Sequence, residues 1–336
     1  TDVLGSNGLQ PPKTWEDYLD VASKIHGQDM NGDGEGDFGS CIFKKRNAQS
    51  YFAIQTFAAP IVQTQGTAQG FHFDNSNMKP IINNDGWKKA FELYKATGKY
   101  GPPDELNMDI GDTRALFKAG RCGLIVEWGD PGTLQLDDDA SAIKGKMYAI
   151  SAVGSKEVLD RATGKLVPVS ASTAPYAVDG INYAPFAAFG GWAGAVNKGA
   201  DAKTKAAAYA FLSYMNQAAQ SGVDVTIGAT GYNPYRTSQL ASTDLWVKAG
   251  MPQALADNYL GAINGAINNL NMASDMKIPG AQKYTSVVLD TELARYLAGE
   301  ISVDEALANI EEGWEEVTED FGRDEQVASQ ALALGL

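Results

Sequence analysis

The sequence predicts an α/β fold with a ligand cleft, and three observations support this prediction. Residues 115–131 end a helix, turn at Gly120, continue as an apolar strand and stop at Trp128 and Asp130. Helical and strand-like segments alternate through residues 14–131, and the chain of 336 residues is long enough for two packed lobes. Because small ligands bind at the carboxyl ends of strands in open α/β sheets, Trp128 and Asp130 lie where recognition is expected.

The first helix of this alternation is predicted to begin after Thr14. Thr14 is a suitable N-cap, and Asp17 follows three positions later, as in a capping box. A short strand is predicted over 38–43 and a helix over 51–59. The apolar face of the first helix comprises Trp15, Tyr18, Leu19, Ala22 and Ile25. These segments are typical of a layered α/β fold.

The segments that lead to the cleft strand continue the pattern. Residues 71–74 alternate like a strand, and the next helix is predicted to follow Asn84 or Asp85, either of which can cap it. A further helix over 112–118 leads into the strand that stops at Trp128.

The second half of the chain is predicted to be irregular at first and then helical. Residues 151–188 are rich in Ser, Thr, Pro and Ala without periodicity, which favours the loops and short strands of a crossover between lobes. A strand is predicted over 189–197 and an Ala-rich helix over 202–215. Three more helices are predicted over 245–260, 285–297 and 303–321, the last after a Ser302 cap.

Composition and motifs exclude several classes of protein. The formal net charge is -14 and the 27 Lys and Arg residues form no basic stripe, which argues against a nucleic-acid partner. No apolar run reaches the roughly 18 to 20 residues that a membrane helix needs. Neither His26 nor His72 belongs to a metal-binding pair, and the sequence has no nucleophile-elbow or phosphate-loop motif, so we expect no enzyme activity.

The two cysteines, Cys41 and Cys122, leave two possibilities open. They are too few for a disulfide scaffold, and they lack the spacing of a metal site. They can form one bridge, or both can be buried free thiols. The sequence alone favours neither.

The strongest local motif is an acidic loop over residues 29–37. Side-chain oxygens recur at its first, third, fifth and ninth positions, with Gly34 at the sixth, as in a loop that wraps Ca²⁺. The twelfth position is Ser40 instead of Glu, and a strand follows instead of a helix, so the loop is not an EF-hand. The expected ligands are Asp29, Asn31, Asp33, Asp37 and the carbonyl of Glu35. The alternative is a solvated acidic turn.

The order and spacing of four segments resemble the extracellular solute-binding proteins of ABC importers, the family that includes maltose-binding protein. The segments are Pro11–Tyr18, Ala115–Pro131, Phe189–Asn197 and Leu289–Trp314, the last with a Gly-Glu-Ile-Ser-Val-Asp-Glu-Ala-Leu run from Gly299. The resemblance extends from about Asp2 to about Gly322. It implies a periplasmic-binding-protein-like fold of type II, with two lobes, a hinge and a ligand cleft between the lobes.

The resemblance also implies a division of the chain. Residues 1–188 correspond mainly to the C-terminal-type lobe, 189–240 to the returning segment of the N-terminal-type lobe, and 241–336 to a helical segment that packs back on the C-terminal-type lobe. The βα-rich first part of the family's N-terminal lobe has no counterpart in this sequence. We therefore expect the sequence to be a fragment or a partner chain to supply the missing strands.

The function that the resemblance implies is capture of a carbohydrate and its delivery to an ABC permease, with no bond broken. The implied location is extracellular or periplasmic, with any membrane tether in a segment outside this sequence. The alternative is a ligand-sensing or protein-interaction module that keeps the fold without transport.

Four aromatic residues are predicted to stack on the sugar. Trp128 and Trp192 correspond to strand-end positions of the family, whereas Tyr235 and Tyr284 are chosen from their loop context. Aromatic rings present an apolar face to a pyranose ring. The alternative for each is packing in the core, where most large aromatic side chains are buried.

Two charged residues are predicted to hydrogen-bond the sugar hydroxyls. Asp130 can accept hydroxyl hydrogens, but a carboxylate before Pro131 is also a common turn or helix-cap residue. Arg236 can reach the ligand or brace the hinge through a salt bridge.

Overall fold

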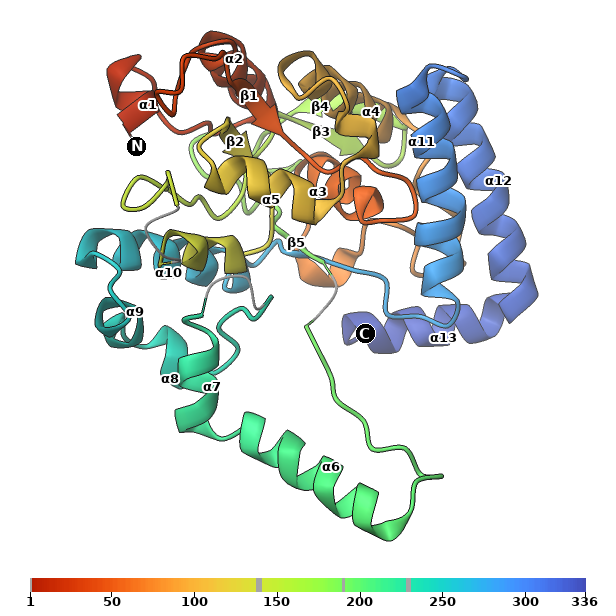
Figure 1. Cartoon of the computed structure of the whole chain (residues 1–336). Coiled ribbons are helices and arrows are strands. Elements are labelled where there is room, and N and C mark those ends of the chain that lie inside the picture. Colours follow the sequence, from red (N-terminus) through yellow and green to blue (C-terminus); the bar gives the residue numbers. More distant parts are fainter. Residues whose placement is uncertain (1, 137–140, 189–190, 228–230) are drawn as a thin grey trace.

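The computed structural model describes residues 2–136, 141–188, 191–227 and 231–336. Figure 1 shows a body that contains both ends of the chain and an arm that ends in α6, below the body in this view. The longer helices are α2 (Trp15–Ile25), α3 (Ser50–Val62), α4 (Asp85–Thr97), α5 (Ile110–Lys118), α6 (Ala202–Met215), α10 (Gln253–Ile267), α11 (Asp290–Ala298), α12 (Val303–Phe321) and α13 (Arg323–Leu334). Shorter helices are α1 (Asp2–Ser6), α7 (Ala218–Asp224), α8 (Thr237–Leu240) and α9 (Asp244–Lys248).

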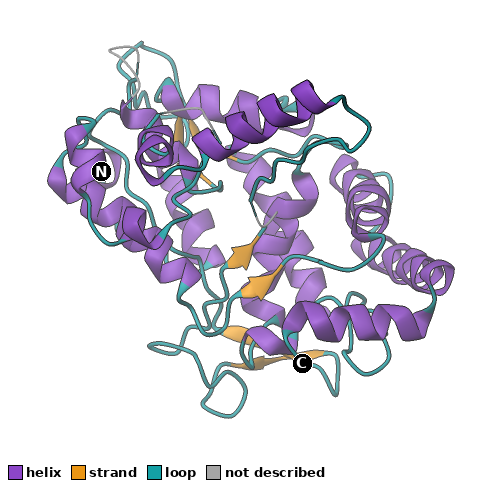
Figure 2. Ribbon diagram, turned by 90° about the horizontal axis from the view of Figure 1, so that it is seen from below, coloured by secondary structure: helices purple, strands orange, loops and turns teal. Residues whose placement is uncertain are grey.

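The strands form three pairs within the described part of the chain. They are β1 (Phe38–Cys41), β2 (Cys122–Ile125), β3 (Glu157–Asp160), β4 (Lys165–Pro168), β5 (Phe186–Ala187) and β6 (Ala273–Ser274). The pairs β1–β2 and β5–β6 are parallel, and β3–β4 is an antiparallel hairpin. Seen from below, these short strands are dispersed among the helices and loops (Figure 2). Single 3-10 turns are η1 (Thr67–Gln69), η2 (Gly98–Tyr100) and η3 (Glu105–Asn107), and longer segments are the 3-10 helix η4 (Asp130–Leu136) and the π-helix η5 (Lys283–Leu289).

The pairing of β5 with β6 shows where the chain leaves the body and returns to it. Phe186 lies opposite Ala273, and Ala187 lies opposite Ser274. The arm therefore lies between these two strands and contains α6 to α10. The return at β6 comes later than the boundary predicted at residue 241, because α9 and α10 also belong to the arm.

Helix beginnings predicted from side-chain caps are confirmed. Thr14 and Asp17 form a capping box at α2, and the Asn84 side chain accepts hydrogen bonds from two backbone N–H groups of α4. The Ala-rich helix has the predicted bounds, and Ser302 caps α12. These signals are local, so the sequence shows them without knowledge of the tertiary structure.

Several predicted elements differ in the structure. The helix predicted over 245–260 is two helices, because Gly250 has a φ of 103° and Pro252 precedes α10. Residues 191–197 form no strand, and residues 189–190 of that prediction lie outside the described residues. Residues 71–74 contribute a single bridge, from Phe73 to Pro80. The sequence predicts no helix at α1, α7, α8 or the C-terminal α13.

The body is held together by an aromatic core. Trp15 stacks on Phe57 with ring centroids 3.6 Å apart, and Trp314 of α12 contacts Phe73 with centroids 5.1 Å apart. Burial of such large side chains is the main source of stability.

Among the described residues, no helix is both long and apolar enough to cross a membrane.

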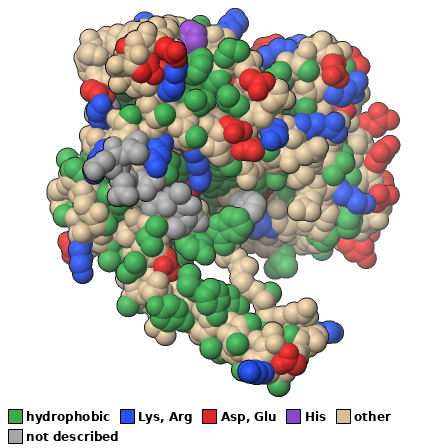
Figure 3. Space-filling model, in the orientation of Figure 1, with side chains coloured by type: hydrophobic (Ala, Val, Ile, Leu, Met, Phe, Trp, Pro, Cys, Tyr) green, Lys and Arg blue, Asp and Glu red, His purple; other side chains and the backbone are tan. Residues whose placement is uncertain are grey.

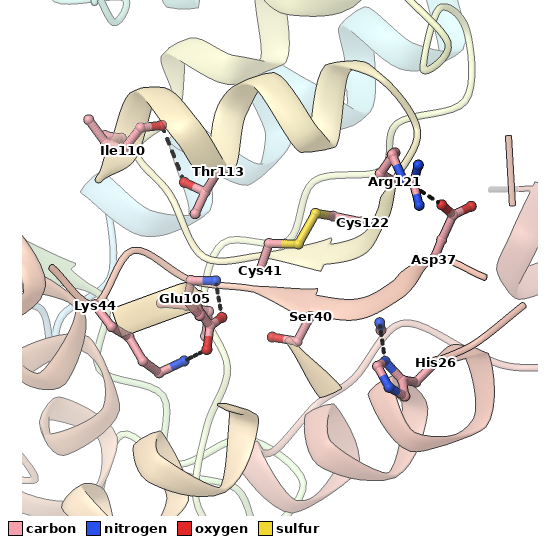
Figure 4. Close-up of a disulfide and its surroundings, with 12 residues drawn as sticks. His26, Asp37, Ser40, Cys41, Lys44, Glu105, Ile110, Thr113, Arg121 and Cys122 are labelled. Carbon is pink, nitrogen blue, oxygen red and sulfur yellow. Dashed lines mark hydrogen bonds and ion pairs between the residues drawn. A yellow bond between two sulfur atoms is a disulfide. The ribbon is translucent and has the colours of Figure 1, made fainter. Parts of the chain in front are cut away.

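A disulfide joins β1 to β2, which settles the alternative left open by the sequence. Cys41 and Cys122 are bonded, with their Cα atoms 5.9 Å apart (Figure 4). Phe117, Leu134 and Ile143 are buried around the bridge. The bridge therefore fixes the strand that leads to Trp128.

The arm has its own small core, but α6 lies outside it. Trp246 and Tyr259 pack with centroids 6.1 Å apart, within a cluster that also includes Val225, Met251, Ala256 and Leu260. In contrast, no residue of α6 is buried, and Tyr209 and Phe211 are 70% and 61% exposed. Figure 3 shows the hydrophobic side chains that gather on this arm.

Candidate functional site

A cavity of about 680 Å³ lies between the body and the arm, at the end of β2. This volume is in the range of small-molecule sites. The body contributes residues 122–129, 146–153 and 184–188 to its wall, and the arm contributes Asn233, Pro234 and one face of α10. Both parts therefore contribute to the wall of the cavity.

Trp128 lines this cavity, as the sequence predicts for a residue at the end of the strand. Its ring is stacked near-parallel to Phe43, with centroids 5.7 Å apart, and meets Phe52 edge-on at 5.5 Å. Its backbone N–H donates a hydrogen bond of 2.8 Å to Glu127 Oε1. The indole is thus held in place by two other rings while it forms part of the wall.

Behind Trp128, one guanidinium contacts two carboxylates. Arg114 of α5 donates to Glu127 Oε2 and Oε1, at 3.0 and 3.1 Å. It also donates to Asp130 Oδ1 at 3.0 Å and lies 2.9 Å from Oδ2. Burial raises the pKa of Glu127 to about 7 against the lowering effect of Arg114, and burial also raises the pKa of Asp130.

The Asp130 carboxylate is therefore engaged by Arg114 and is buried. Asp130 is not among the residues that line the cavity, although Gly129 and Pro131 are. Its position at the start of η4 agrees with the alternative interpretation as a turn residue. The expected direct hydrogen bond to a ligand is not what this arrangement provides, because the Asp130 carboxylate is buried and is not part of the cavity wall.

Three other predicted ligand contacts lie in the arm outside the cavity. The Trp192 indole N–H donates to the Gly231 carbonyl at 3.2 Å. Tyr235 is half-exposed, with the Arg236 guanidinium 5.4 Å from its ring centre. Arg236 Nε donates to Ser221 at 3.1 Å, and its Nη2 donates to the carbonyl of Asn216. Arg236 thus braces the arm, although its partners are not carboxylates.

Tyr284 is part of the body's core, which corrects the expectation that it faces the ligand. Its side chain is fully buried, its hydroxyl lies 2.9 Å from Thr318 Oγ1, and its ring meets Trp314 edge-on. The π-helical turn η5 turns this side chain toward α12. A ring enclosed in this way cannot stack on a sugar in the cavity.

Among the polar residues of the cavity wall, Glu127, Asn233 and Tyr259 are not predicted from the sequence. The signal that points to Glu127 is its position immediately before Trp128 in the strand-end motif. Asn233 and Tyr259 come from the arm, and no local pattern connects them to β2.

The acidic loop is closed by an arginine. Arg121 contacts Asp33, Glu35 and Asp37, with nitrogen–oxygen distances of 3.4, 2.9 and 3.1 Å, and Figure 4 shows the contact with Asp37. Asp29 accepts hydrogen bonds from the backbone N–H groups of residues 32, 33 and 34. Within the described residues, no group of three or more His, Cys, Asp or Glu side chains is arranged to hold a metal ion.

Comparison with solved structures identifies the fold. The chain is similar to an ABC transporter solute-binding protein from Agrobacterium radiobacter K84 in complex with ribitol, with 20% identity and a TM-score of 0.64, covering 94% of this chain and 67% of the other. It is also similar to the maltose-bound MalE3 of T. maritima, with 17% identity and a TM-score of 0.65, covering 94% and 68%. These likenesses confirm the predicted α/β, periplasmic-binding-protein-like fold.

Sequence comparison identifies the family. No curated protein sequence matches the chain significantly. The family model described as "Bacterial extracellular solute-binding protein" matches residues 1–253, which is more than half of the chain. The chain therefore belongs to the bacterial extracellular solute-binding proteins.

Proposed function

We propose that this protein captures a sugar or polyol in the cavity beside Trp128 and presents it to an ABC importer. The position of Trp128 carries the proposal, because an indole supported by two rings and forming a cavity wall is suited to stacking on a carbohydrate. Structurally similar solute-binding proteins are bound to ribitol and D-mannitol. Capture and delivery require no chemistry, which agrees with the expectation that the protein is not an enzyme.

The mechanism is closure of the arm on the body. The two connections β5 and β6 pair side by side, so they form a narrow hinge. Beside them, the buried Asn271 amide donates to the Gln63 carbonyl at 2.8 Å and to Asn182 Oδ1 at 3.1 Å. This network fixes the base of the hinge to α3. A ligand that contacts both sides of the cavity shifts the population toward the closed state.

We further propose that an α/β segment other than residues 1–336 packs on α6 and supplies the missing strands of the arm. Tyr209, Phe211 and Tyr214 are exposed on this helix, which has no buried residue. Solved structures with this fold are longer, because the chain covers 67 to 70% of the ribitol-bound and mannitol-bound proteins. Reading the adjacent coding sequence tests this proposal and also shows whether a secretion leader or lipid anchor is present.

Thermal unfolding with a carbohydrate panel tests the proposed function. A ligand at 100 times its Kd adds about 2.7 kcal/mol to the free energy of unfolding. We expect one class among pentitols, hexitols, monosaccharides and maltodextrins to raise Tm. If no compound shifts Tm, with or without the completing segment, the carbohydrate proposal is rejected and the alternative, a module without transport, is favoured.

We also propose that the acidic loop binds Ca²⁺ with the ligands predicted from its sequence. The supporting observation is the concentration of carboxylates around one guanidinium, since Asp33, Glu35 and Asp37 all face Arg121. Such a group retains net negative charge, which a divalent cation would reduce. Because Arg121 competes for the same oxygens, the site is expected to be weak and to respond to millimolar Ca²⁺.

Replacing Asp33 by Ala is expected to remove the Ca²⁺-dependent increase in Tm. The parent protein should melt at a higher temperature in 5 mM Ca²⁺ than in chelator, by an increment that corresponds to about 1 kcal/mol. The D33A variant should melt equally in both, whereas the control Glu316→Ala, on the exposed face of α12, should behave as the parent does. Equal melting of the parent in Ca²⁺ and in chelator would contradict the site.

A further inference from the structure

Three buried polar atoms of residues that line the cavity have no hydrogen-bond partner among the described residues. One is the indole nitrogen of Trp15, in the body, and the other two, from the arm, are the amide oxygen of Asn233 and the hydroxyl of Tyr259. Both arm residues line the cavity, and Tyr259 is almost completely buried. An unpaired buried polar atom loses its hydrogen bonds to water without replacement, so such atoms require an explanation. A ligand that hydrogen-bonds to them provides one.

Both arm groups lie against the turn that follows Trp128. A Cβ atom at Gly129 would lie 2.7 Å from Asn233 Oδ1, and one at Gly132 would lie 2.2 Å from Tyr259 Cε2. The two glycines therefore allow the arm to approach this turn closely. As a result, Asn233 and Tyr259 of the arm both lie against residues 129–132 of the body. This turn directly follows Trp128 in the sequence.

The charge at this place is negative. Among the described residues that line the cavity, the charged ones are Asp2, Glu127 and Lys146. Lys146 and Asp2 form an ion pair of 3.3 Å. Glu127, in contrast, shares the single guanidinium of Arg114 with Asp130. Two carboxylates against one guanidinium leave one negative charge when both are ionised, in a wall where burial weakens solvent screening.

We propose that Glu127, Asn233 and Tyr259 form a subsite for hydrogen-bond donors, which selects neutral polyhydroxy or amino solutes and rejects acidic ones. Glu127 and the Asn233 oxygen accept hydrogen bonds from ligand hydroxyl or ammonium groups, and the Tyr259 hydroxyl can accept one and donate one. A ligand carboxylate or phosphate would meet the unbalanced negative charge of the Glu127–Arg114–Asp130 group. This inference rests on the proposed capture of carbohydrates in the same cavity.

Matched ligands and variants test the subsite. Dissociation constants are measured by calorimetry for D-glucose, D-glucosamine and D-glucuronate, and for maltose and maltobionate, at pH 8, where Glu127 is ionised. For the parent protein, we expect each acid to bind at least about tenfold more weakly than its neutral counterpart. Glu127→Gln should reduce this preference at least about tenfold, whereas the control Glu316→Gln should retain it.

A second variant separates a ligand contact from a structural role. Tyr259→Phe removes a hydroxyl that has no partner in the described structure, so Tm of the free protein should be unchanged or higher. Affinity for the neutral sugar should nevertheless fall about tenfold, because one hydrogen bond to the ligand is lost. This variant keeps the test valid if Glu127→Gln disturbs folding.

The possible failures are distinguishable. If no compound of any charge binds the parent protein, the proposed carbohydrate function fails and the subsite fails with it. If neutral and acidic members bind the parent equally, the subsite alone is rejected. If the parent protein binds the neutral sugar and Tyr259→Phe binds it with the same affinity, the subsite alone is also rejected.

Discussion

Replacing Trp128 by Ala is expected to weaken carbohydrate binding at least a hundredfold. The substitution removes the indole that lines the cavity and leaves Phe43 and Phe52 without the ring they hold in place. Stacking on an aromatic side chain contributes a large share of the contact area in such a site. Titration calorimetry with the carbohydrate identified by the thermal panel measures the loss.

Conservative replacement separates stacking from folding. Trp128→Phe keeps an aromatic face and should lose no more than about tenfold in affinity. The Ala variant removes a half-buried ring and should also lower the free energy of unfolding by about 1–2 kcal/mol, which is less than the cost of a fully buried tryptophan. Undiminished affinity in a folded Ala variant would show that the ligand does not stack on Trp128.

The elements that the sequence predicts correctly depend on local signals. Thr14 with Asp17, Asn84 and Ser302 cap helices through contacts within a few residues. The strands β1 and β2 lie within the short, mainly apolar segments 38–43 and 122–128. The helix over 245–260 fails for an equally local reason, because Gly250 and Pro252 are strong interruptions that its apolar pattern obscured.

The candidate site is predicted less well because it is built from distant segments. The sequence motif predicts the position of Trp128 after a strand. Asn233 and Tyr259 belong to the arm, and only the tertiary structure brings them to the same cavity. Tyr284 has a loop-like sequence context, as a binding-site aromatic residue would, and is nevertheless a core residue. The ion pair of Asp130 with Arg114 also depends on the packing of α5 beside β2. The spacing of the two residues in the sequence does not predict this pair.

The Cys41–Cys122 bridge connects stability to the ligand cavity, because Cys122 begins β2, and the chain continues from the end of β2 at Ile125 to Glu127 and Trp128. The two cysteines are 81 residues apart, so the bridge restricts a long loop in the unfolded chain. A double Ala variant is expected to lose about 2–5 kcal/mol of unfolding free energy. Urea denaturation measures this loss. The folded variant should retain the cavity, but β2, which leads to Trp128, is no longer joined covalently to β1.

Reduction provides the matched control for this prediction. Dithiothreitol should lower the urea midpoint of the parent protein toward that of the double Ala variant and should leave the variant unchanged. An unchanged midpoint of the parent under conditions where thiol titration confirms reduction would contradict a stabilising role. A stabilising disulfide agrees with the extracellular assignment of the family, because disulfides persist outside the cytosol. The bridge can therefore support β2 and the binding residues that follow it.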